Sequence, residues 1–235
     1  MKRRLKSTIL VVLVLAVGSA GAGSAQAAPL FEADSYAANV DGSALTEAIF
    51  GFHPGASPYK WECLKVPMQG KLTSSSSALT LTPTYQECRW QYPVTEPPQP
   101  FSAVTMTMNG CDWRLHTLSK LKAGEYKSLA DLECPFSKEV VIDLRMGGTI
   151  ICRMKAKAQT SKSQINLIDQ ANKEGSADDS IEAKIAVGGL SYKLEAFLGC
   201  PVGSGTYEDL TYSGIQTLTA TSEAGKQIGL RVTGE

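Results

Sequence analysis

Two pairs of carboxylates are the side chains of this chain best suited to acid-base chemistry. Glycoside hydrolysis uses two carboxyl groups about 5 to 10 Å apart, and the candidates are Asp131 with Glu133 and Asp178 with Asp179. Asp131 and Glu133 alternate on one exposed strand face, and Asp178 and Asp179 fall in a polar stretch. Solvated surface acids are the favoured interpretation, and an extracellular hydrolase with a carboxylate site assembled from distant segments is kept as an alternative.

The two histidines lack recognisable catalytic partners. A serine hydrolase needs a nucleophile, a base and an orienting acid, and its nucleophile often stands in a G-x-S-x-G motif, which this sequence does not contain. His53 lies in a predicted loop, and His116 falls on the polar face of a predicted strand. We therefore predict no catalytic residue and favour a non-enzymatic protein.

The six cysteines have the spacing of disulfides rather than of a metal site. They stand roughly 20 residues apart without a C-x-x-C pair, and the only histidines, His53 and His116, stand alone. The loop acids near Asp178 also lack the regular spacing of a calcium loop. The sequence predicts no metal and no cofactor, and it predicts disulfides among Cys63, Cys88, Cys111, Cys134, Cys152 and Cys200.

Side-chain alternation narrows the 15 pairings that six cysteines allow, because residues paired across antiparallel strands share a face. Joining Cys63 to Cys88 places Trp61 opposite Trp90 and Tyr59 opposite Tyr92, while Glu62 faces Arg89 on the other side. One face of this predicted hairpin is thus aromatic, and the other carries an ion pair.

The same parity argument favours joining Cys111 to Cys134 and Cys152 to Cys200. The first pairing sets Trp113 opposite Leu132 and Asp112 opposite Glu133, and the second sets Met154 opposite Leu198. A bridge from Cys134 to Cys152 remains an alternative, because the stretch between Val140 and Cys152 is itself a predicted hairpin.

Four aromatic residues beside the first predicted disulfide are the candidate binding residues. If they faced water, they would form a flat platform on which sugar rings could stack. If they faced inward, they would fill a small core. Both interpretations are open for Tyr59, Trp61, Trp90 and Tyr92.

The elements that would position these residues are strands. Alternation of apolar and polar residues predicts strands at Ser77 to Leu81, Val104 to Met108, Trp113 to Thr117, Glu139 to Leu144, Thr149 to Ala156, Ile181 to Val187, Leu190 to Leu198 and Ile228 to Val232. Turns are predicted at Gly147-Gly148, Gly188-Gly189, Gly203 to Gly205 and Ala224-Gly225. The predicted fold is all-β: an antiparallel sandwich or an irregular barrel of disulfide-bridged hairpins.

Residues 1–27 have the three parts of a secretory signal peptide. A basic start precedes an apolar run from Ile9 to Val17 and an Ala25-Gln26-Ala27 cleavage site. Residues 28–235 are then the secreted β-rich region, and the prolines between residues 93 and 100 mark either a surface loop or a boundary between two β units. We expect a protein that is secreted, extracellular or at the cell surface.

The charge of the secreted region is mildly acidic. Residues 1–27 carry four basic and no acidic residues, which leaves 19 Lys and Arg against 23 Asp and Glu, a net charge of about −4. Nothing in this balance favours nucleic acid as a partner. No apolar stretch after the signal peptide is long enough to span a membrane.

Several turn and cysteine segments resemble a group of uncharacterised secreted bacterial β-rich proteins with six cysteines. The resembling segments are Thr80 to Tyr85 followed by Cys88, Met108 to Cys111, Cys134-Pro135, Gly205 to Tyr207, Tyr212 to Gly214 and Gly225 to Gly229. The resemblance implies secretion and an all-β fold, and it implies no activity or ligand.

These observations predict a secreted or cell-surface β protein that acts by binding or as a structural component. The candidate partner is a cell-wall or polysaccharide surface. Besides the hydrolase, a second alternative is a protease inhibitor that presents the proline segment at residues 93–100 to a protease. The oligomeric state is left open.

Overall fold

The computed structural model describes residues 27–53, 59–91, 102–160, 164–170 and 179–234, and these residues form strands without a helix. The strands are Leu30–Ala33 (β1), Ala38–Ala44 (β2), Ala48–Phe52 (β3), Tyr59–Lys65 (β4), Met68–Leu72 (β5), Ala78–Pro83 (β6), Gln86–Gln91 (β7), Ser102–Thr107 (β8), Asp112–Lys122 (β9), Glu125–Glu133 (β10), Val140–Met146 (β11), Thr149–Ala156 (β12), Gln164–Asp169 (β13), Ile181–Ala196 (β14), Gly205–Ser222 (β15), Gln227–Ile228 (β16) and Leu230–Thr233 (β17). The predicted all-β class is confirmed.

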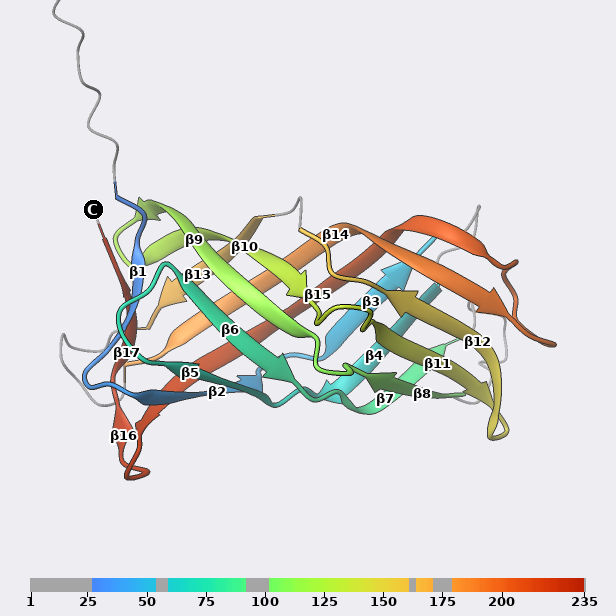
Figure 1. Ribbon diagram of the computed structural model, residues 1–235, viewed down its shortest axis with the longest axis horizontal. Coiled ribbons are helices and arrows are strands. Elements are labelled where there is room, and N and C mark those ends of the chain that lie inside the picture. The colour runs from blue at the N-terminus through green and yellow to red at the C-terminus, as the bar shows by residue number, and fades with distance from the viewer. Residues whose placement is uncertain (1–26, 54–58, 92–101, 161–163, 171–178, 235) are drawn as a thin grey trace, which may run out of the picture.

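Most of the short strands are halves of longer ones. Six couples of successive strands each run in line as one interrupted strand: β2 and β3, β4 and β5, β6 and β7, β8 and β9, β10 and β11, and β12 and β13. The evidence is the pairing, because the two strands of one couple pair with the two strands of the next couple along the chain. Together with the long strands β14 and β15 they make eight antiparallel strands in chain order, six of them interrupted near the middle (Figure 1).

The sheet closes on itself through β15. One edge of this strand pairs with β14, and the other pairs with β3 at Thr211–Ser213 and with β2 at Gln216–Ser222. Of the two predicted architectures, a sandwich and an irregular barrel, the closed sheet is the irregular barrel. Because the sheet is closed, the long strands have no free edge along most of their length.

The interruptions form a waist around the closed sheet. We use this name for the links at residues 45–47, 66–67, 84–85, 108–111, 134–139 and 157–160, together with Gly188 and Gly189 of β14. The links are bonded to one another and to adjoining strands: the amide of Thr84 donates to the carbonyl of Pro67 at 2.8 Å, and Gln159 exchanges backbone hydrogen bonds of 3.0 and 2.8 Å with Leu132 of β10.

Gly188 and Gly189 do not form the predicted turn. The predicted strands Ile181 to Val187 and Leu190 to Leu198 are one strand, β14, and the register slips between Val187 and Leu190. Gly189 has a φ of +69°, which a β-bulge tolerates at glycine, and both Val187 and Leu190 point inward. After the bulge, even-numbered rather than odd-numbered residues point inward. A prediction from alternation alone therefore places a strand end there.

The interior divides at the waist into two halves of different composition. Between β2, β5, β6, β9, β10 and β13, the aliphatic half, the buried side chains include Met68, Leu72, Leu79, Leu81, Leu115 and Leu167. Between β3, β4, β7, β8, β11 and β12, the aromatic half, they include Phe50, Phe52, Tyr59, Trp61, Trp90 and Tyr192. Inward residues alternate with outward ones on nearly every strand, as burial of one sheet face requires.

A separate two-stranded sheet packs at the aliphatic end. Strand β1 pairs with β17, so the predicted strand from Ile228 to Val232 is divided between β16 and β17. Phe31 and Leu230 are fully buried there, and Asp34 accepts a hydrogen bond from Arg231 at 2.6 Å. The pair of strands brings the beginning and end of the described chain together (Figure 1).

The three disulfides join Cys63 to Cys88, Cys111 to Cys134 and Cys152 to Cys200, the pairing favoured by parity. The register around the first two is also as predicted: Trp61 lies opposite Trp90, and Trp113 lies opposite Leu132. Asp112 and Glu133, two acids that lie opposite each other in this register, each have another partner: Thr82 donates to Asp112 at 2.6 Å, and Arg114 pairs with Glu133 at 2.9 Å.

The register predicted around the third disulfide is wrong by four residues. Cys152 lies opposite Ala196 and Met154 opposite Leu194, while Cys200 follows the end of β14 and reaches back through a turn closed by a bond from its amide to Phe197. A register shift of four residues, an even number, keeps each side chain on the same face of the sheet. The face argument therefore selected the correct cysteine partner although the predicted register was wrong.

Candidate functional site

The aromatic residues predicted for binding are core residues wherever the structure describes them. Trp61 and Trp90 are 1% and 2% exposed, and Tyr59 is 8% exposed. Trp61 stacks on Phe50 with the ring centroids 4.9 Å apart. These three side chains therefore do not form a platform facing water, and Tyr92 lies outside the described residues. Burial wins because both strands that carry them turn the same face to the closed interior.

The predicted carboxylate pair Asp131 and Glu133 serves as partners for neighbouring basic side chains. Asp131 lies 3.1 Å from His116, and Glu133 pairs with Arg114 at 2.9 Å. These contacts run along the outer face of β9 and β10. Asp131, Glu133 and His116 thus pair with neighbouring side chains across the polar surface of the sheet.

The remaining acid-base candidates are dispersed. Asp179 is buried beside β17, where its carbonyl accepts a hydrogen bond from Leu230 at 3.1 Å, and Asp178 and Glu174 lie outside the described residues. The backbone amide of His53 donates to Asp209 at 2.8 Å. Within the described ranges, no three His, Cys, Asp or Glu side chains gather in a way that could hold a metal ion.

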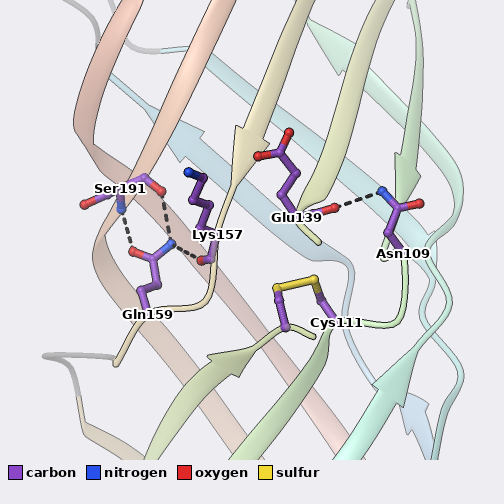
Figure 2. The surroundings of a disulfide bond; sticks show 7 residues. Asn109, Cys111, Glu139, Lys157, Gln159 and Ser191 are labelled. Carbon is purple, nitrogen blue, oxygen red and sulfur yellow. Dashed lines mark hydrogen bonds between the residues drawn. A yellow bond between two sulfur atoms is a disulfide. The ribbon is translucent and has the colours of Figure 1, made fainter. Parts of the chain in front are cut away.

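Polar contacts surround the second disulfide, Cys111–Cys134, at the waist (Figure 2). The amide side chain of Gln159 replaces a missing strand pairing: it accepts from the Ser191 amide at 2.7 Å and donates to the Ser191 carbonyl at 3.0 Å. Asn109 donates to the carbonyl of Glu139 at 2.8 Å. Because Cys111–Cys134 also ties two links together here, this part of the waist is occupied by structural bonds.

Another part of the waist, at the link between β2 and β3, adjoins an open groove of about 610 Å³. It crosses the outer face of β13, β14 and β15 and reaches the link between β2 and β3. Its lining consists of Thr46, Glu47, Ile49, Asn166, Lys184, Ile185, Ala186, Ser213, Gly214 and Ile215. We call this feature the outer groove, and its volume falls within the range of small-molecule sites.

Small side chains form the floor of the outer groove, and longer ones stand around it. Ala186, Ser213 and Gly214 leave the sheet surface low, while Ile49, Lys184 and Glu47 rise beside them. Ile49 is 38% exposed and presents apolar surface to the groove. The surface therefore offers a low floor of small residues, surrounded by polar side chains and by the apolar Ile49.

The groove has one ammonium and one carboxylate group on its rim. Lys184 lies 3.3 Å from Glu182, and Glu47 lies 4.0 Å from Arg89, so both are in exposed ion pairs of little energetic weight. The hydroxyl of Thr46 accepts from the amide of Ile215 at 3.0 Å, which fixes the end of the groove. The rim thus carries one positive and one negative group, so a ligand of this groove need not be charged.

The sequence did not indicate the outer groove. Its residues come from four strands and one link, and none of them belongs to a recognised motif. The one available signal was Ser213 on the polar face of β15 opposite Ala186 of β14, with Gly214 next to it in the chain. Only closure of the sheet brings the β2 to β3 link against that low surface.

Comparison with known proteins adds no relationship: no family model, no curated protein and no solved structure matches this chain. The six cysteines in three disulfides and the β-rich fold agree with the described features of the group that the sequence resembles, and no family is confirmed. Among the described residues there is no helix with the length and apolar character needed to cross a membrane.

Proposed function

We propose that this protein is an extracellular, non-enzymatic binding protein whose outer groove takes a segment of cell-wall polysaccharide. The observation that carries the proposal is the groove itself, a concavity of ligand size built on a closed, disulfide-bridged sheet. Sites on strands hold their shape better than sites on loops, so such a groove would be preorganised for a ligand.

The chemistry of the lining supports a polyhydroxylated ligand. Ser213 and Asn166 offer a hydroxyl and an amide that can both donate and accept hydrogen bonds, as sugar hydroxyls require. Ile49 and Ile215 offer apolar surface to the C–H face of a sugar ring. The buried tryptophans supply no stacking surface, so binding would depend on these hydrogen bonds and on shape.

Location outside the cytoplasm is part of the proposal. Residues 1–27 have the composition of a signal peptide, and three disulfides are consistent with an oxidising compartment. Secretion can be tested by expressing the full chain in a bacterial host with a secretory pathway. We expect the mature N-terminus to follow Ala27 and the protein to appear outside the cytoplasm.

Co-sedimentation with isolated cell wall and with insoluble polysaccharides tests the binding proposal. Ala186→Trp would fill the floor of the groove, and Ala103→Trp, on the outer face of β8 across the closed sheet, is the matched control. We expect wild type and Ala103→Trp to sediment with at least one of these materials and Ala186→Trp to remain in solution. Equal behaviour of the two variants, or no binding by wild type, would contradict the proposal.

A further inference from the structure

Apolar side chains point into water at the end of the closed sheet that lies away from β1 and β17 (Figure 1). Leu198, in the turn that follows β14, is 97% exposed, and Phe197 beside it is half exposed. Met146, where β11 turns into β12, is also half exposed. We call these three residues the apolar tip. Apolar side chains gathered on one part of a surface commonly mark a contact with another protein or with a membrane.

The turn that carries Leu198 is held firmly in place. The amide of Phe197 donates to the carbonyl of Ile151 at 2.9 Å. The amide of Cys200 donates to the carbonyl of Phe197 at 3.0 Å, and Cys200 is bridged to Cys152. Because Ile151 and Cys152 belong to β12, these bonds also hold the turn beside the hairpin of β11 and β12. The exposure of Leu198 is therefore built into a bridged turn.

Basic side chains outnumber acidic ones on the outer face behind the apolar tip. We call this surface the basic face, and it consists of β11, β12 and the part of β14 that pairs with β12. Four of its six charged residues are basic, whereas the secreted region as a whole has more acids than bases. The six are Asp143, Arg145, Arg153, Lys155, Lys193 and Glu195. The net charge of the chain thus conceals a local positive excess.

Two cations of the basic face have no close carboxylate of their own. Lys155 lies 2.8 Å from Glu195, whereas Lys193 lies 3.5 Å from the same carboxylate and is mostly exposed. Lys193 also stands directly opposite Lys155 in the sheet, and like charges in that position are unfavourable. Arg145 lies 3.8 Å from Asp143, which is bonded more closely elsewhere. Lys193 and Arg145 can therefore accept an anionic group from solvent.

We propose that the apolar tip and the basic face together dock this protein on a membrane whose lipids carry negative charge. The tip enters the boundary between headgroups and acyl chains, and the basic face meets the lipid phosphates. A few apolar side chains alone bind a bilayer weakly, so the cations supply the second signal. A bilayer suits a protruding turn, because lipids close around a convex tip without a matching pocket. This surface shares no residue with the outer groove.

Sedimentation of the disulfide-bonded protein with lipid vesicles tests the proposal. The probes are vesicles of phosphatidylcholine alone and vesicles of phosphatidylcholine and phosphatidylglycerol in equal parts. We expect the protein to sediment far more with the mixed vesicles, and we expect added salt to weaken this binding. Ala186→Trp, which fills the outer groove, should bind the mixed vesicles as wild type does.

Two pairs of matched variants assign the binding to this end of the molecule. Leu198→Ser should lower the vesicle partition coefficient about tenfold, whereas Phe136→Ser, at a 99% exposed position of the waist, should leave it unchanged. Lys193→Gln should lower the coefficient about fivefold. Lys71→Gln, which removes a lysine from an exposed ion pair of the aliphatic half, should leave it unchanged.

All four substituted side chains are exposed, so each variant should keep the wild-type unfolding midpoint. Absence of sedimentation with the mixed vesicles, equal sedimentation with both kinds of vesicle, or equal partition of Leu198→Ser and Phe136→Ser would overturn the proposal. A dimer in sedimentation velocity that Leu198→Ser dissociates would also overturn it, because the apolar tip would then be a contact between two copies of the chain.

Discussion

The two halves of the closed sheet solve the same packing problem with different side chains. The aliphatic half fills most of its interior with aliphatic side chains, although it also buries Trp113 and Tyr126, and it receives the β1–β17 pair at its end. The aromatic half stacks more large rings and carries the disulfides Cys63–Cys88 and Cys152–Cys200. Rings fill more volume for each residue, but they pack with specific geometry. The difference suggests that the end without a capping strand pair relies on rings and covalent links instead.

The aliphatic and aromatic halves meet at the waist. Six strands break there, and their backbone groups are satisfied by links, by the Gln159 side chain and by the Thr46 hydroxyl. The same breaks place small residues of β14 and β15 beside the β2 to β3 link. The proposed binding groove is thus a consequence of how the two halves are joined.

Loss of a ring from the aromatic half should have the largest effect on stability. Trp61→Ala removes a 1% exposed indole stacked on Phe50 and should lower the free energy of unfolding by about 4 kcal/mol. Leu81→Ala, at an equally buried position of the aliphatic half, should cost about 3 kcal/mol. Denaturant unfolding of both proteins measures the difference. A cost below about 1 kcal/mol for Trp61→Ala would show that the aromatic half is loosely packed.

Removal of the Cys63–Cys88 bridge should have the next largest effect. The double variant Cys63→Ala and Cys88→Ala frees a loop of 25 residues, which on the chain-entropy estimate lowers stability by about 3.5 kcal/mol. Hydrogen exchange should show faster opening of β4 and β7 than of β5 and β6. Uniformly faster exchange in both halves would mean that they unfold as one unit rather than as two.

A smaller effect is expected from the bulge of β14. Gly189→Ala introduces a Cβ at a φ of +69° and should lower stability by about 1 kcal/mol, because L-residues are strained in this region. Gly203→Ala is the control, since open space surrounds that position and its φ lies outside the left-handed region. Equal unfolding midpoints for the two variants would contradict the role assigned to the bulge.

Acid titration should give the smallest effect and also distinguish the halves. The hydrogen bond from Arg231, aided by the Gly229 amide, holds the pKa of Asp34 below its ordinary value of 3.8, so this contact stabilises the fold above that pH and is lost as pH falls through the lower folded value. Asp34→Asn should flatten that part of the stability profile.

On the aromatic half, a hydrogen bond from Lys155 and the charge of Lys193 lower the pKa of Glu195. This side chain is half-buried, like that of Asp34, but its partners are two lysine ammonium groups rather than an arginine and a backbone amide, so its titration should change stability less. Carbon-detected NMR titration of the two carboxyl groups, beside unfolding at each pH, measures both effects. A normal pKa for Asp34 would contradict the contact between Asp34, which follows β1, and Arg231 of β17.

Alternation and parity predicted the class of fold and favoured the disulfide partners that the structure has, with a Cys134–Cys152 bridge left open, because both depend on which face a residue occupies. They were insufficient at Gly188–Gly189, where a bulge shifts the parity inside one strand, and at Cys200, which lies beyond the ladder. Parity also could not decide whether Trp61 and Trp90 faced water, since that depends on closure of the sheet through β15. The outer groove was unpredictable for the same reason.

The most direct test of the proposed function is an NMR titration of the isotope-labelled, disulfide-bonded protein with soluble fragments of cell-wall polysaccharide. The account predicts saturable shift changes confined to the outer groove, including the amides of Ala186, Ser213 and Ile215, and their loss in Ala186→Trp. Saturable changes centred elsewhere, or none with any fragment, would contradict the assignment of the groove as a polysaccharide site.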